Sequence, residues 1–344
     1  MIEVKNLSKR YGNHLAVKEA NFTISKGEIV GFLGPNGAGK STIMNILTGY
    51  ISLTGGSATV GGYDIVENPE QAKRHIGYLP EHPPLYVDMT VREYLNFIYD
   101  LKKVKFPKKP HIDEICKLVS IDNVEGRLIK NLSKGYRQRV GIAQALVGNP
   151  DVLILDEPTV GLDPKQIIEI RKLIEALGKH HTVIVSSHIL SEIQAVCKRI
   201  IIINKGEIVA DDTADNLSKN LSSSHTVKLR VQGPEAEIEK TLLGIRGVSS
   251  VKSLGVVEKS SIDFEIEPLD DADIRKDISL RMSDRKWPIL ELSTEEMSLE
   301  RIFLRLTDGS FDIPAKQVKK IQRDESIIEN SEVFGDAKNK EDDK

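Results

Sequence analysis

The stretch GPNGAGKST, residues 34–42, decides the fold class. It matches the pattern G-x-x-x-x-G-K-[ST], follows the strand-like EIVGFL (28–33) and precedes the helix-like TIMNILTG (42–49). Glycines allow successive backbone N–H groups to curl around phosphates, while Lys40 reaches the β/γ oxygens and Ser41 ligates Mg²⁺. The stretch therefore predicts a phosphate-binding loop between a strand and a helix. A Gly-rich turn that simply leads into a helix is the alternative.

The composition is that of an ordinary globular protein. The 344 residues include 40% hydrophobic and 29% charged side chains, which is enough chain for about two domains. A net charge of −3 and an aromatic content of 5% provide no basic or aromatic-rich surface, so no nucleic acid partner is expected. No run approaches the roughly 18 apolar residues of a membrane span, and the N-terminus lacks an apolar signal core. We therefore expect a cytoplasmic protein.

The two cysteines, Cys116 and Cys197, lie far apart in the sequence and have no neighbouring ligand pairs. A disulfide or a metal site would need a partner at suitable spacing. We therefore expect two buried thiols in a reducing compartment.

The first 210 or so residues alternate β-rich runs with helical patterns, which is typical of an α/β layer protein. The continuous apolar runs VLIL and VIV are typical of central parallel strands that are covered on both faces. Lys-rich helical segments predict a helical insertion over about residues 81–150. Strands are expected at residues 2–7, 20–25, 28–34, 75–80, 151–156 and 182–187, with an edge hairpin over 199–211.

The remainder of the chain follows a different order. After the nucleotide-binding domain expected at 1–215, polar residues mark a linker at 216–225. Residues 226–310 alternate strand, helix, strand, strand, helix, strand, which suits a small ferredoxin-like α+β domain. Residues 323–344 are acidic, so we expect a disordered tail. An amphipathic helix, either ordinary core or a docking face, is expected from the spacing of Leu299, Ile302, Phe303 and Leu306.

Cations crowd the start of the helix that is expected in NLSKGYRQRVGIAQAL (131–146). Lys134, Arg137 and Arg139 fall in its first turns, where the helix dipole favours anions. Each cation there destabilises the helix by about a few tenths of a kcal/mol unless a negative group lies opposite. The pattern therefore predicts that this helix faces an anion.

VLILDEP (152–158) places two carboxylates, Asp156 and Glu157, at the C-terminal end of a buried strand. Ligands of open α/β sheets bind at such strand ends. Asp156 suits a hold on Mg²⁺ through its water, and Glu157 could orient or deprotonate an attacking water. Two solvated carboxylates are the alternative. The phosphate-binding loop in the same chain favours the catalytic pair.

This set of motifs resembles the nucleotide-binding subunit of ATP-binding cassette (ABC) transporters. The phosphate loop, LSKGY followed by RQR, LDEPTVGLDP, and SSH occur in that family's order over residues 1 to about 215. The resemblance implies an α/β P-loop ATPase domain with a β-rich N-terminal subdomain, and ATP and Mg²⁺ as ligands. GYLPE, LSKGYRQR and the C-terminal domain resemble the bacterial exporters that act in drug resistance and gliding motility.

The resemblance also implies roles for individual residues. Lys40, Glu157 and His188 would be catalytic, with His188 as the switch histidine that contacts the γ-phosphate and Glu157. Tyr11 matches the aromatic residue that stacks on adenine, or is a strand-end tyrosine without special role. Asp163 matches the loop that contacts the other subunit, and would also cap the following helix. The phosphate loop comprises Gly34, Pro35, Asn36, Gly37, Ala38, Gly39, Lys40, Ser41 and Thr42.

Two motifs depart from the family pattern. Glu81 stands where the family most often has the Gln that contacts Mg²⁺; Glu keeps an oxygen but cannot donate a hydrogen bond, or it simply faces solvent. LSKGY replaces L-S-G-G-Q, so that Lys134 and Tyr136 vary. Ser133 and Gly135 remain as donors to the γ-phosphate of a second subunit's ATP. The expected anion at this helix is therefore the triphosphate held by a second copy or a related ATPase subunit.

The implied function is that of an ATP-hydrolysing subunit that energises transport, with export favoured. Its place would be the inner face of the cell membrane, on a separate integral membrane permease. A soluble ABC ATPase of translation or DNA repair is the alternative, although such proteins usually carry two cassettes or a long coiled-coil insertion. A P-loop kinase or switch would lack the signature and the switch histidine.

Overall fold

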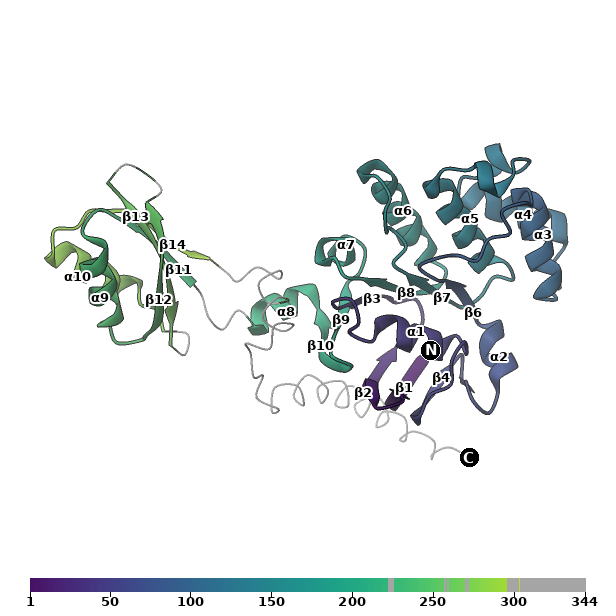
Figure 1. The fold of residues 1–344 in the computed structure, drawn as a ribbon, viewed down its shortest axis with the longest axis horizontal. Helices are drawn as coiled ribbons and strands as arrows, with labels where there is room; N and C mark the ends of the chain where they lie inside the picture. Colours follow the sequence, from purple (N-terminus) through teal and green to yellow (C-terminus); the bar gives the residue numbers. More distant parts are fainter. Residues whose placement is uncertain (222–225, 257, 259, 270–271, 296–302, 304–344) are drawn as a thin grey trace, which may run out of the picture. The chain divides into compact units, whose positions relative to one another are not determined.

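The computed structural model describes residues 1–221, 226–256, 258, 260–269, 272–295 and 303 (Figure 1). Within this part the chain divides into two compact units, Met1–Asp212 and the described residues of Thr213–Asp308. The expected acidic tail at 323–344 lies outside the described residues. So does the expected apolar stripe, except for Phe303.

The first unit begins with a four-stranded antiparallel sheet of order β2-β1-β4-β5. Its strands are β1 (Ile2–Tyr11), β2 (His14–Ile24), β4 (Gly55–Val60) and β5 (Tyr63–Asp64). β1 and β2 extend beyond the expected strands because the polar ends of the two pair with each other, as Tyr11 does with His14. β4 and β5 are not predicted by the sequence, since the Gly-rich GGSATV buries only two apolar side chains, those of Ala58 and Val60.

The second sheet of this unit has six strands in the order β10-β9-β3-β8-β7-β6. The neighbouring strands β9, β3, β8, β7 and β6 run parallel. The strands are β3 (Ile29–Leu33), β6 (Ile76–Leu79), β7 (Val152–Asp156), β8 (Thr182–Ser187), β9 (Arg199–Asn204) and β10 (Glu207–Thr213). β7 and β8 are buried along their whole length, as predicted for central strands. The carboxyl ends of β3, β7 and β8 therefore meet at one edge of the sheet.

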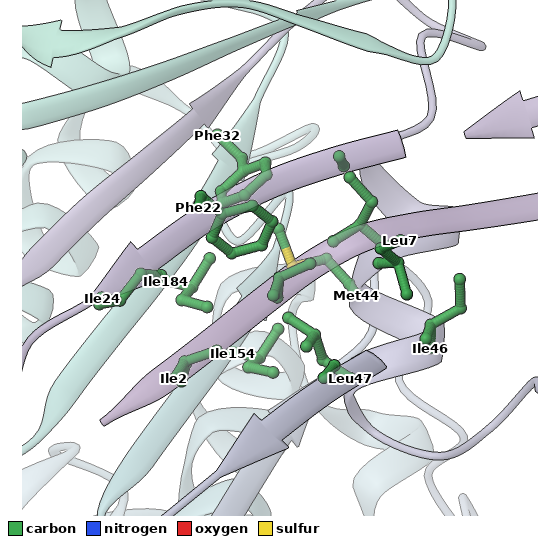
Figure 2. Packing of buried hydrophobic residues seen from close by; sticks show 14 of the residues in the cluster. Ile2, Leu7, Phe22, Ile24, Phe32, Met44, Ile46, Leu47, Ile154 and Ile184 are labelled. Atoms are coloured by element: carbon green, nitrogen blue, oxygen red, sulfur yellow. The ribbon is translucent and has the colours of Figure 1, made fainter. Parts of the chain in front are cut away.

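One hydrophobic core joins the two sheets (Figure 2). Phe22 of β2 packs edge-on against Phe32 of β3, with 5.2 Å between ring centroids. Met44, on helix α1 (Lys40–Leu47), lies fully buried among side chains from both sheets, such as Leu7 and Ile154. Each large side chain buried in this way contributes about 1.5–3 kcal/mol. The packing fixes α1 directly behind the phosphate loop.

Helices make up most of the remaining first unit. Three of them lie between β6 and β7 in the sequence, where a helical insertion is expected, and are gathered together in Figure 1: α3 (Val91–Leu101), α4 (Lys108–Leu118) and α5 (Lys134–Leu146). The others are α2 (Pro69–Arg74), α6 (Pro164–Leu177) and α7 (Leu190–Gln194), with 3₁₀ turns at Asp122–Val124 and Ile129–Asn131. No helix in the described residues is long and apolar enough to cross a membrane.

The second unit carries a four-stranded antiparallel sheet of order β12-β13-β11-β14, with two helices packed on its apolar side chains. The order strand, helix, strand, strand, helix, strand is that of the ferredoxin-like motif. Phe264, Ile278 and Met282 are fully buried in its core. The elements are β11 (Thr226–Val231), α9 (Glu235–Leu243), β12 (Val248–Val256), β13 (Ile262–Pro268), α10 (Arg275–Asp284) and β14 (Ile289–Glu295).

Part of the expected linker is helical. Residues 216–221 belong to helix α8 (Ala214–Leu221). The hydroxyl of Thr213 accepts a hydrogen bond from the Asn216 N–H at 3.2 Å, as a helix cap does, and Leu217 is buried. The polar composition conceals the helix because a short helix gains most of its stability from tertiary packing, here that of Leu217, rather than from its own sequence pattern.

Both cysteines are free thiols and are buried, Cys116 on α4 and Cys197 just after α7. Burial raises the pKa of each thiol to about 12. The expectation of two buried, unpaired thiols is therefore confirmed. Neither is poised to act as a nucleophile, because the thiolate is the reactive form.

Candidate active site

The phosphate loop connects the end of β3 to the start of α1. Gly39 occupies the N-cap position with a φ of 113°, and no side chain caps the helix. A Cβ at Gly39 would also lie 2.8 Å from the Ala16 carbonyl oxygen, so only glycine fits there. The first N–H groups of α1 have no partner within the helix. They are available to an anion such as a phosphate.

The loop is held from behind by the turn between β9 and β10. The Gly206 N–H donates to the Ala38 carbonyl at 2.9 Å, and the Lys18 N–H donates to the Gly206 carbonyl at 2.8 Å. A Cβ at Gly206 would come within 2.7 Å of the Ala16 carbonyl oxygen. The phosphate loop is thus packed against backbone from the β9–β10 turn and from β2 of the other sheet.

Lys40 lies at the first position of α1 and is only 5% exposed. Its Nζ donates to the Gly34 carbonyl at 2.7 Å and to the Pro35 carbonyl at 3.3 Å, and lies 3.8 Å from Glu157 Oε1. Burial lowers the pKa of Lys40, against the opposing charges of Glu157 and Asp156. The ammonium is therefore held between the loop and a carboxylate, where it could meet a phosphate.

Asp156 is the last residue of β7 and Glu157 directly follows it, as the sequence predicts. Glu157 has a φ of 49°, a left-handed conformation that costs about 1–2 kcal/mol for a residue with a Cβ, and it is only 6% exposed. Its N–H donates to Ser186 Oγ at 2.9 Å, and that hydroxyl donates to Asp156 Oδ1 at 2.5 Å. Ser186 of β8 therefore fixes both the strained backbone and the neighbouring carboxylate.

His188 follows β8 and contacts the same carboxylate. Its Nδ1 lies 3.1 Å from Oε1 and from Oε2 of Glu157. The structure thus brings together Lys40 at the start of α1, Glu157 directly after β7 and His188 directly after β8. A carboxylate between an ammonium and an imidazole can accept a proton from a water molecule placed beside it.

The oxygen donors near this group suit Mg²⁺. Ser41 is exposed at the start of α1, Asp156 ends β7, and Glu81 follows β6 in an exposed loop close enough for its charge to raise the pKa of Lys40 against burial. The described residues contain no group of three or more acidic, His or Cys side chains arranged as a metal cage. Mg²⁺ is usually held by one or two carboxylates, waters and phosphates, so this sparse donor set fits it.

Tyr11 and Asp163 take positions compatible with their expected roles. Tyr11 ends β1 with 47% of its surface exposed, and Lys9 Nζ lies 5.1 Å from its ring centroid. The ring is therefore accessible to a stacking partner. Asp163 accepts a hydrogen bond from the Gln166 N–H at 2.9 Å and caps α6, as its position before Pro164 indicates.

LSKGY forms the start of α5. Ser133 is the N-cap, and its hydroxyl accepts from the Tyr136 N–H at 3.4 Å. Gly135 is buried, and a Cβ there would come within 2.7 Å of the Gln166 side chain on α6. Lys134 is exposed, and its Nζ lies 2.0 Å from where a Cβ at Gly161 would be. The stretch therefore packs on the loop before α6 in its own chain.

The prediction that the anion comes from a second subunit is wrong for one of the three cations, Arg139. Arg139 donates from Nη2 to Glu169 Oε2 of α6 at 2.7 Å, and from Nη1 to the Val119 carbonyl at 2.8 Å. Its negative partner is thus in the same chain, because α6 packs beside α5 and brings a carboxylate that helical spacing alone cannot reveal. Within the described residues, Lys134 and Arg137 form no ion pair.

Several hydroxyl groups that sequence reasoning does not single out connect the strand ends. Besides Ser186, these are Thr159 and Ser187, which both donate to Glu192 Oε2 of α7, at 2.6 Å and 3.0 Å. The available signal is the Ser-Ser pair that ends a buried strand. Because side chains alternate along a strand, such a pair places one hydroxyl on each face of the sheet.

Together, the strand-loop-helix that carries Lys40 and the carboxylates at the end of the adjacent buried strand define a P-loop nucleoside triphosphatase. Among known families, the model of the ABC transporter family matches residues 17–160. The chain is 34% identical to the linearmycin resistance ATP-binding protein LnrL of Bacillus subtilis over 313 residues, 89% of this chain and 98% of LnrL. It is 39% identical to the bacitracin transport ATP-binding protein BcrA of Bacillus licheniformis, over 64% of this chain and 72% of BcrA. The chain belongs to the ABC transporter family.

Solved structures agree with this assignment. The dimeric structure of the bacterial ABC transporter cassette MJ0796 matches with a TM-score of 0.57 and 28% identity, over 62% of this chain and 98% of that one. Its post-hydrolysis state with ADP and Pi matches with a TM-score of 0.56 and 27% identity, over the same shares of the two chains. The predicted α/β P-loop fold is confirmed. The chain is an ATP-binding, ATP-hydrolysing subunit of a transporter, and translation or DNA repair is not supported.

Proposed function

We propose that two copies of the chain enclose ATP between the phosphate loop of one copy and Ser133 and Gly135 of the other. Closure and hydrolysis would then drive export through a separate membrane permease. The observation that carries the proposal is the buried Glu157 carboxylate, within reach of Lys40 and His188 at one edge of the sheet. Subunits of this family work with membrane permeases, and cassettes of the family form dimers.

In this proposal the phosphate loop binds the triphosphate through its N–H groups, and the Lys40 ammonium contacts the β- and γ-oxygens. A water attacks the γ-phosphorus in line, the bond to the β-phosphate oxygen breaks, and ADP leaves. Glu157 accepts the proton of that water, and His188 orients the carboxylate. Ser41, Glu81 and Asp156, the last through water, would hold Mg²⁺, which neutralises charge on the phosphate oxygens.

The second copy contributes donors to the γ-phosphate. The exposed cations Lys134 and Arg137 at the start of α5 lack a carboxylate partner among the described residues, which favours an anion from outside the chain. Ser133 adds its hydroxyl at the same helix start. We assign Tyr11 to the adenine ring and Asp163 to the contact between copies.

Mixing two inactive variants tests the shared site. Lys40→Ala and Ser133→Ala are each expected to hydrolyse ATP at a small fraction of the wild-type rate. In a mixed dimer, one of the two sites combines an intact Lys40 with an intact Ser133. Equal mixing of the purified chains should therefore restore about a quarter of the wild-type rate, since random pairing makes about half of the dimers mixed.

No recovery on mixing, while each variant still folds and Ser133→Ala still binds ATP, would contradict the shared site. Melting temperatures serve as the control, because Ser133→Ala also removes a helix cap that stabilises by about 1 kcal/mol. Gly135 is the poorer choice for this test. A side chain there collides with Gln166 in the same copy.

Export through a permease is supported by the relatives, whose names concern linearmycin resistance and bacitracin transport. We infer that the chain binds the inner face of the cell membrane through that permease. A tagged chain purified from detergent-solubilised membranes of its own cells is expected to retain a polytopic membrane protein. Recovery with ribosomes or DNA instead would argue against transport.

A further inference from the structure

One carboxylate of α7 connects the two loops that carry the reacting groups. Glu192 Oε2 accepts from Thr159 Oγ1 at 2.6 Å and from Ser187 Oγ at 3.0 Å. Thr159 lies two residues after Glu157, and Ser187 directly precedes His188. Both hydroxyl residues are buried, at 6% and 1% exposure. A single oxygen therefore joins the end of β7 to the end of β8.

The bridge also fixes the backbone around His188. Ser187 Oγ accepts from the Ile189 N–H at 3.0 Å, so its hydrogen is free to be donated to Glu192. The Ser187 hydroxyl thus fixes the chain on both sides of His188, because it belongs to the residue before it and accepts from the N–H of the residue after it. This limits where the imidazole can lie relative to Glu157.

A second bridge lies on the opposite face of β8. Ser186 joins Asp156 and the Glu157 N–H, while Ser187 joins Glu192 and, through it, Thr159. Because successive side chains of a strand point to opposite faces, the two serines tie β7 to β8 from both sides. Glu157 needs such support, since its left-handed φ of 49° is unfavourable.

Within the described residues, Glu192 makes no hydrogen bond or ion pair with Lys40, Glu157 or His188. A carboxylate suits the bridging task because it only accepts, and an O–H···O⁻ bond is stronger than a bond between neutral groups. Its influence on hydrolysis must therefore pass through the loops that it holds.

We propose that Glu192 is a positioning residue for ATP hydrolysis, which keeps Glu157 and His188 at hydrogen-bonding separation by holding Thr159 and Ser187. The inference rests on the roles proposed above for Glu157 and His188. Displacement of a reacting group by a fraction of an ångström slows turnover without changing how the phosphate loop binds ATP. The expected signature is a lower kcat with an unchanged affinity for ATP.

Three single variants of the full chain test this. Glu192→Ala is expected to lower kcat by about tenfold and to change the ATP dissociation constant by less than about twofold. Glu192→Gln keeps an acceptor oxygen and is expected to retain at least about half of the wild-type kcat. Gln194→Ala, at an exposed position at the end of the same helix, is the matched control. Wild-type kcat in Glu192→Ala, or a tenfold loss in Glu192→Gln, would overturn the proposal.

A double variant separates positioning from a general loss of stability. If Glu192 acts through His188, adding Glu192→Ala to His188→Ala should lower kcat by no more than about twofold further. A full tenfold further loss overturns the proposal. If Glu192→Ala does not fold, Thr159→Val removes one donor at constant shape. It should lower kcat by about threefold with ATP affinity kept, and an unchanged kcat there counts against the inference.

The two proposals fail in different ways. If His188→Ala and Glu157→Gln both keep wild-type turnover, the proposed function is wrong. If they lose turnover and Glu192→Ala does not, only the positioning role of Glu192 is wrong.

Discussion

Glu157→Gln is expected to bind ATP normally and to hydrolyse it about 10²- to 10⁴-fold more slowly than the wild type, which is the contribution typical of a general base. The amide has nearly the shape of the carboxylate, so the contact with His188, 3.1 Å from both oxygens, is largely kept. What is lost is the ability to accept a proton from water. Single-turnover hydrolysis of bound ATP measures this step directly.

A second readout follows from the same variant. Because the proposed mechanism has hydrolysis release the paired copies, Glu157→Gln should remain dimeric in ATP, as size-exclusion chromatography with ATP in the buffer would show. Glu175→Gln makes the same chemical change at an exposed position on α6 and is the matched control. Undiminished hydrolysis by Glu157→Gln would remove Glu157 from the mechanism.

Lys40→Ala is expected to weaken ATP binding by about 10- to 100-fold, the loss typical of a charge-assisted hydrogen bond. Turnover should fall by more than about 10³-fold, since the ammonium also meets charge that develops on the transferred phosphate. The variant leaves the carbonyls of Gly34 and Pro35 without the lysine donor and the Glu157 carboxylate without the ammonium that lies 3.8 Å away. Titration with a fluorescent ATP analogue and steady-state hydrolysis separate the two effects.

The lowered pKa of Lys40 also predicts that the affinity for ATP depends on pH. Because burial lowers the pKa of Lys40, the charged amine proposed to bind phosphate is lost at a lower pH than for an exposed lysine. ATP affinity of the wild type should therefore fall as the pH rises through that lowered pKa, and Lys40→Ala should lack this fall. Lys172→Ala, at an exposed site on α6, is the control. Retained turnover in Lys40→Ala would reject the assignment of the phosphate loop.

The sequence predicts those parts of the site that lie on one short segment. The phosphate loop with Lys40, and the carboxylates Asp156 and Glu157, need only a strand, a turn and a helix in the right order, which apolar runs and glycines reveal. The central strands β7 and β8 are predictable for the same reason. Their side chains are buried on both faces, so the apolar run is continuous.

What the sequence does not reveal depends on contacts between distant segments. The partner of Arg139 is Glu169 on another helix, and the partner of Thr159 and Ser187 is Glu192 on a third. No spacing rule connects these positions, because packing rather than periodicity brings them together. Strand β4 was missed for a related reason: its pairing with β1 supplies the stability that its own side chains do not.

The turn at Gly206 changes how variation in this protein is to be interpreted. Its N–H supports Ala38, and its closeness to Ala16 leaves no room for a side chain. An inherited substitution at this glycine would push on the phosphate loop and appear, in a genetic screen, as an ATP-binding allele, although it lies far along the chain from that loop. Surveys that rank variants by distance from a motif in the sequence would score such an allele as harmless.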